Sequence, residues 1–95
     1  MKIMARDRFP LGQTVATPGA LEAFARTGEE PLPFLAQHAT GTWGELDDND
    51  IAANEVAVQR GFRILSAYRL ADDTRIWVIT EADRSVTTIL LPEEY

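Results

Sequence analysis

The sequence has no cysteine among its 95 residues. This absence excludes disulfide bonds, thiol nucleophiles, thiolate zinc sites and iron–sulfur clusters. Histidine is also scarce: His38 is the only one, so a metal site would have to combine it with distant carboxylates. We therefore expect no bound metal and no cofactor.

Long hydrophobic runs are missing as well. No apolar stretch approaches the roughly 20 residues that a membrane-spanning helix needs. Residues 1–8 carry charges where a signal peptide would need an apolar segment. We therefore expect a cytoplasmic protein with no membrane partner.

Basic residues are outnumbered. The chain has 9 lysines and arginines against 15 aspartates and glutamates, which gives a net charge of −6. An acidic chain is repelled by nucleic acid backbones, whereas a basic protein surface complements it. The composition therefore predicts a protein partner with a basic surface and no direct contact with nucleic acid.

No motif commits the chain to a reaction. The six glycines are scattered singly and form no phosphate-binding loop. A calcium loop starting at Asp47 would need a glycine where Ala52 stands and a glutamate where Val58 stands. His38 has no serine nearby in a triad-like context. We assign no catalytic residue, and the sequence favours a non-enzymatic protein.

Helical signals fill the first two thirds of the chain. A helix over residues 18–27 is predicted after Thr17, a good N-cap, and it ends before a glycine. A second short helix is expected over residues 31–39. A third, over residues 48–60, begins after the capping Asp47 and also ends at a glycine.

Strand signals follow the helices. Alternating patterns predict strands over residues 62–70, 75–80 and 86–91, and their short connections indicate an antiparallel meander. Residues 13–16 are predicted as a short first strand. The expected fold is one α+β domain over residues 1–95, with about three N-terminal helices packed on a three- to four-stranded antiparallel sheet.

Five segments carry a resemblance to a known family. Residues 66–68, 77–85 and 91–95, together with residues 10–13 and 16–20, resemble a family of small uncharacterised bacterial proteins. That family is often carried on plasmids, integrative elements and phages. The resemblance implies a bacterial cytoplasmic setting and an accessory role for a mobile element, and it implies no catalytic residue.

Acidic side chains dominate the middle of the sequence, where every charged residue between positions 29 and 55 is acidic. One interpretation is a negative face that mimics nucleic acid phosphates and occupies a basic groove on a partner. The other, simpler interpretation is helix capping and solvation. The candidate partner-binding residues come from this stretch and from the polar loop 81–85: Glu45, Asp47, Asp48, Asp50, Glu81, Asp83 and Arg84.

Glu55 is the one acid that the helical projection places among apolar positions. A carboxylate on the buried side of a helix needs a partner, or its pKa rises. We expect a structural ion pair between Glu55 and Arg63, with Arg69 as the alternative partner on the same strand. A perturbed acid in a cleft is the functional alternative.

Three classes of function remain after these exclusions. The first is a non-enzymatic interaction protein, such as a mobile-element inhibitor of the anti-restriction or anti-CRISPR type, that binds a basic, nucleic-acid-handling protein. The second is a structural or assembly module that forms a homodimer. The third is a small enzyme with a carboxylate–histidine site built from Glu55, His38 or Asp83. Size, charge and the resemblance favour the first class.

Overall fold

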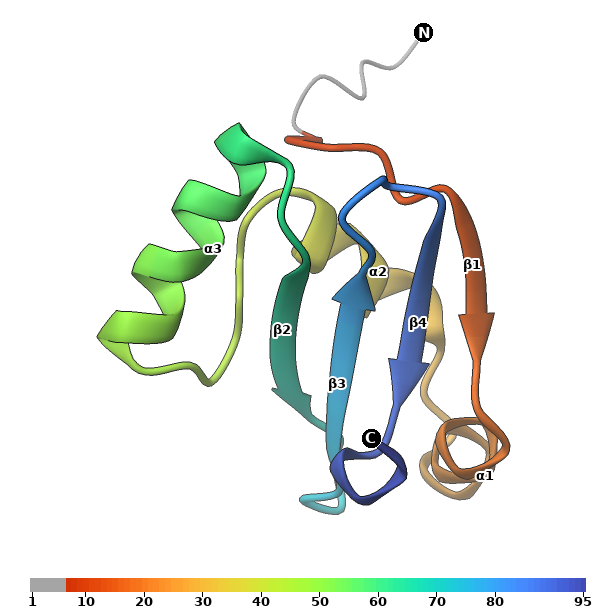
Figure 1. Ribbon diagram of the computed structural model, residues 1–95. Helices are drawn as coiled ribbons and strands as arrows, with labels where there is room; N and C mark the ends of the chain where they lie inside the picture. The colour runs from red at the N-terminus through yellow and green to blue at the C-terminus, as the bar shows by residue number, and fades with distance from the viewer. Residues whose placement is uncertain (1–6) are drawn as a thin grey trace, which may run out of the picture.

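The computed structural model describes residues 7–95, which form one small α+β unit (Figure 1). The elements in chain order are β1 (Gln13–Ala16), α1 (Pro18–Thr27), α2 (Pro31–Ala39), α3 (Asp48–Arg60), β2 (Ile64–Arg69), β3 (Arg75–Thr80), β4 (Val86–Leu90) and a short 3₁₀ turn, η1 (Pro92–Glu94).

Local capping sets the helix ends as the sequence predicted. The Thr17 side chain accepts a hydrogen bond from the Ala20 backbone N–H at the start of α1. Asp47 does the same for the Asp50 N–H at the start of α3. Gly61 ends α3 with a φ of 78°, a left-handed conformation that costs glycine little.

The sheet is mixed, which corrects the predicted antiparallel one. The strand order is β1-β4-β3-β2, and the β2-β3-β4 part is the expected antiparallel meander. However, β1 pairs with β4 in parallel. The last strand is therefore interior, and β1 lies at the sheet end. The two outer meander strands are also shorter than the predicted ranges 62–70 and 86–91.

The helices do not all cover the same sheet face. Figure 1 shows α2 behind the sheet. The helices α1 and α2 supply Ala20, Phe24 and Leu35 to the main core. There these side chains meet Tyr68 and Val78, which point to the same side of the sheet. In contrast, α3 runs beside β2. The sheet face toward the viewer in Figure 1, which we call the open sheet face, has no α-helix across it, and only η1 lies in front of its lower end.

The outer edge of β2 is closed by side-chain and loop contacts. The Asn54 amide of α3 donates to the Leu65 carbonyl at 2.8 Å and accepts from the Leu65 N–H at 3.2 Å, as a neighbouring strand would. Ala67 exchanges backbone hydrogen bonds with Trp43 and Glu45 of the loop before α3. These contacts leave little of this edge for another strand to use.

Gly44 makes that loop contact sterically feasible. Its φ is 80°, and a Cβ at this position would overlap the Ala67 carbonyl oxygen. Only glycine combines the left-handed backbone with such a close approach. A single glycine in the sequence thus allows the loop to run against β2.

Candidate functional site

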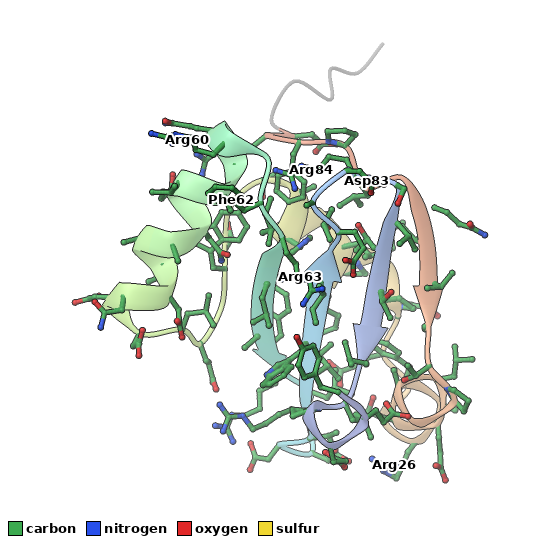
Figure 2. The ribbon with its side chains drawn as sticks, viewed as in Figure 1. Arg26, Arg60, Phe62, Arg63, Asp83 and Arg84 are labelled. Atoms are coloured by element: carbon green, nitrogen blue, oxygen red, sulfur yellow. The ribbon has the colours of Figure 1, made fainter. Side chains whose placement is uncertain are left out.

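The seven candidate partner-binding residues fall into two groups at opposite ends of α3. Glu45, Asp47, Asp48 and Asp50 lie around its N-terminus. The other three belong to the β3–β4 hairpin, which meets the helix C-terminus (Figure 2). They therefore do not form one continuous acidic face.

The hairpin charges are engaged in local structure. The Arg84 guanidinium donates to the carbonyls of Ala57 and Phe62 at 2.8 and 2.7 Å, at the C-terminal end of α3, where the helix dipole favours a cation. Asp83 accepts from the Ser85 N–H at 3.0 Å, and hydrogen bonding by Ser85, its side chain first and then this N–H, lowers the pKa of Asp83. Arg84 and Asp83 thus shape the turn and hold it on α3.

Glu55 does not pair with Arg63 or Arg69, which corrects the predicted ion pair. Its carboxylate forms a bidentate pair with Arg8 at 2.7 and 3.0 Å and accepts from the Trp43 indole N–H at 3.1 Å. These hydrogen bonds, Arg8 first, lower the pKa of Glu55 to about 2. The side chain is 45% exposed, so it is not on a buried face.

Arg63 and Arg69 have other partners. Arg63 lies 3.4 Å from Glu81 and donates to the Tyr95 hydroxyl at 2.9 Å, across the open sheet face (Figure 2). Arg69 pairs with Glu45 at 3.1 Å, and that hydrogen bond is the main cause of the lowered pKa of Glu45. Strand alternation alone does not reveal these pairs, because each joins different elements.

His38 lies fully buried within a series of hydrogen-bonded hydroxyl groups, between Ser66 and Thr80. Its Nδ1 is 2.5 Å from Ser66 Oγ, and its Nε2 is 2.9 Å from Thr80 Oγ1. Thr80 contacts Thr87 at 2.6 Å, and Thr87 donates to the Leu11 carbonyl at 2.7 Å. Every buried polar side-chain atom in this hydrogen-bonded series has a partner.

The carbonyl at the end of this hydrogen-bonded series assigns the His38 tautomer. Because the Leu11 oxygen only accepts, Thr87 must donate to it and therefore accept from Thr80. Thr80 must in turn accept from His38, so Nε2 carries the proton and Nδ1 accepts from Ser66. Burial of this neutral ring lowers the pKa of His38 to about 4.

The residues of the proposed carboxylate–histidine site do not come together. His38 is sealed in the core with both nitrogens engaged, Glu55 pairs with Arg8, and Asp83 is exposed in the hairpin. Among residues 7–95, no three histidine, aspartate or glutamate side chains are grouped to hold a metal ion. This arrangement offers no solvent-facing imidazole for acid–base chemistry.

The largest hollow that we describe lies between α3 and the open sheet face. Its volume is about 430 Å³, and its apolar lining includes Leu65, Ala67 and Trp77 of the sheet. We call it the α3 groove; its remaining lining residues are Glu45, Leu46, Asp50, Ala53, Asn54, Arg63 and Arg75. The only sign of this groove in the sequence is the strand alternation, which places Leu65 and Ala67 on the sheet face opposite to that of Ser66.

Trp77 contributes a partly exposed aromatic surface to this groove. Its ring packs edge-on against Tyr95, with centroids 5.6 Å apart, and the indole is only partly buried. Asp50 and Arg75 line the same hollow, and neither side chain forms an ion pair with another described residue. The groove thus offers an aromatic surface and two charges of opposite sign.

The chain matches no protein-family model, no curated protein and no solved structure. Within residues 7–95, no helix has the length and apolar character to cross a membrane.

Proposed function

We propose that the protein is a non-enzymatic interaction domain that binds a basic, nucleic-acid-handling protein through the α3 groove. The observation that carries this proposal is the groove itself, with the apolar surface of Leu65, Ala67 and Trp77 next to the acidic start of α3. A sizeable hollow with an apolar lining and a few polar groups is the usual form of a binding site.

The α3 side of the groove is acidic and favours a basic segment, whereas the sheet side carries Arg63 and Arg75. Asp48 and Asp50 lie in the first turn of α3 and have exposed side chains. A partner lysine or arginine beside these carboxylates would gain their attraction, and a neighbouring cationic or apolar side chain would pack on Trp77. The net charge of −6 would also speed the encounter with a basic surface.

An inhibitor or accessory protein of a mobile element is the narrower form of this proposal. The small size, the net charge and the sequence resemblance support it. Anti-restriction and anti-CRISPR proteins act on partners with basic nucleic-acid channels, for which an acidic interaction domain is a natural competitor.

The test is a pull-down from a nuclease-treated bacterial lysate with matched charge variants. The double variant Asp48→Asn/Asp50→Asn neutralises the groove rim, and Glu22→Gln/Glu30→Gln removes the same charge from exposed positions on and next to other helices. We expect the native protein to retain a basic partner that high salt releases. The rim variant should retain about tenfold less, and the control should match the native protein.

Two outcomes would contradict the groove as the binding site. If both double variants lost the partner equally, net charge alone would govern retention. If Ala53→Arg, which places a large cation on the α3 wall of the groove, had no effect, the partner would bind elsewhere.

A further inference from the structure

The outward side of β1 carries unpaired backbone groups. The N–H groups of Gln13 and Thr17 donate toward β4, to Ser85 and Ile89. Backbone groups of a strand point alternately to its two sides, so those of Thr14 and Ala16 point away from β4. In the described part of the chain, no strand pairs with that side of β1.

This edge lacks the usual protection against strand pairing. The residues of β1, Gln-Thr-Val-Ala, include no charge and no proline. At the other end of the sheet, Asn54 and the loop before α3 occupy the β2 edge. Figure 1 shows β1 as the last strand on the right, with no element beyond it.

Exposed apolar side chains accompany the open edge. Val15 is 40% exposed, and Leu21, at the start of α1, is 55% exposed. Both line a hollow of about 250 Å³ beside β1, together with Pro31 and Leu35. Backbone groups and apolar surface are therefore available in the same place, as strand addition requires.

We propose that β1 pairs with β1 of a second copy of this chain, antiparallel about a two-fold axis through Val15. In that register Thr14 lies opposite Ala16 of the second copy, and each such pair exchanges both backbone hydrogen bonds. The two outward residues are symmetric about Val15, so the strand is its own complement. The result is one continuous sheet across two subunits.

A second copy is favoured over a charged partner segment at this edge. The strand is uncharged, so it offers nothing for a basic segment to recognise, whereas self-pairing needs only the symmetric backbone register. Each subunit carries a net charge of −6, and their mutual repulsion weakens as salt increases. Self-association should therefore strengthen with salt, opposite to the partner binding proposed for the α3 groove.

The absence of cysteine allows a specific cross-linking test with Val15→Cys in the full chain. The two Val15 residues form a non-hydrogen-bonded pair with Cα atoms about 4.5 Å apart, within the range that a disulfide spans. The control is Val56→Cys, at a somewhat more exposed valine on α3, with 49% exposure against 40% for Val15. We expect Val15→Cys to form a disulfide dimer at least about tenfold faster under mild oxidation. Equal rates for the two variants would overturn the proposal.

Thr14→Pro tests the backbone hydrogen bonds. Proline removes the outward N–H of Thr14, while the Gln13 and Thr17 N–H groups still donate toward β4. Sedimentation equilibrium at high salt should show self-association for the native protein and for the control Thr14→Ser, and a monomer for Thr14→Pro with an unchanged circular dichroism spectrum. A native protein that stays monomeric at all concentrations, or a Thr14→Pro variant that still associates, would overturn the proposal.

Discussion

At the scale of single residues, His38 behaves as a structural group that depends on its neutral form. In the neutral ring, Nε2–H donates to Thr80 and Nδ1 accepts from Ser66. Adding a proton would bury a charge, and the Ser66 hydroxyl would have to stop donating to Nδ1 and accept from it instead. Burial therefore favours the neutral imidazole.

The first prediction is a loss of stability in mild acid. The folded pKa of His38 is about 4 and the ordinary value is 6.5, so between these values the unfolded chain binds a proton that the folded chain does not. The free energy of unfolding should therefore fall as the pH decreases from 6.5 to 4, by about 3 kcal/mol in total. Urea denaturation across this range measures it.

A matched variant separates His38 from other acid effects. No other histidine is present, so His38→Gln should remove most of the slope above about pH 5, even if that variant is less stable at every pH. A native protein whose free energy of unfolding is constant between pH 6.5 and 5 would contradict the assignment.

The second prediction concerns the partner of Glu55. A double-mutant cycle of Glu55→Gln with Arg8→Met should give a coupling of about 0.5–1 kcal/mol, modest because both side chains are partly exposed to solvent. The matched cycle with Arg63→Met should give no coupling. Because the pKa of Glu55 is lowered from 4.5 to about 2, this contribution is present above pH 4.5 and is lost toward pH 2. A larger coupling with Arg63 than with Arg8 would restore the pair expected from the sequence.

At the scale of elements, the two edge strands of the sheet differ in how much of their backbone is covered. A helix side chain and a glycine-dependent loop occupy the backbone groups of β2, whereas β1 has exposed backbone on its outer side. The helix α3 thus acts partly as an edge cover, which explains why its buried residues are Asn54 and Ala57 and not large apolar ones. The same position beside β2 creates the α3 groove.

The third prediction tests this role of Asn54. Asn54→Ala should lower the free energy of unfolding by about 2 kcal/mol, because the Leu65 N–H and carbonyl lose their partners in a partly buried place. Gln59→Ala, an exposed α3 control, should change it by less than about 0.5 kcal/mol. Hydrogen exchange should also become faster at the Leu65 amide. If both variants had the same stability as the native protein, the Asn54 contacts would not be energetically significant.

At the scale of the whole molecule, some acidic side chains are in ion pairs, and others lie at the start of α3 without an ion pair to another described residue. Glu45 and Glu55 are engaged by Arg69 and Arg8, and Glu29 accepts a backbone hydrogen bond from Ala71. The least engaged acids of the middle segment include Asp48 and Asp50 in the first turn of α3, and Asp50 lines the groove. Asp47 caps α3, as the simpler interpretation expected, whereas the ion pairs of Glu45 and Glu55 were part of neither interpretation. The acids beside the groove are what remains for a partner.

The fourth prediction follows from having two separate surfaces. Partner retention through the groove should decrease with salt, while self-association through β1 should increase with it. Thr14→Pro should abolish only the second, and Asp48→Asn/Asp50→Asn only the first. Sedimentation and pull-down of the same two variants at low and high salt measure both, and a shared loss in either variant would mean that the surfaces are not independent.

Local signals in the sequence determined the helices and the meander. Thr17, Asp47 and Gly61 act on backbone groups within a few residues, and alternation in the last third needs only neighbouring strands. Such short-range effects can be inferred from a single sequence. The α+β class and the three helices were predicted for this reason.

Only the tertiary structure decided the pairs that join distant parts of the chain. The parallel partner of β1, the Arg8–Glu55 pair and the position of α3 beside β2 each join segments that the sequence separates widely. Several arginines were available to Glu55, and no local rule ranks one above another. Packing of the whole chain selects among them, and the same packing produces both the α3 groove and the open β1 edge.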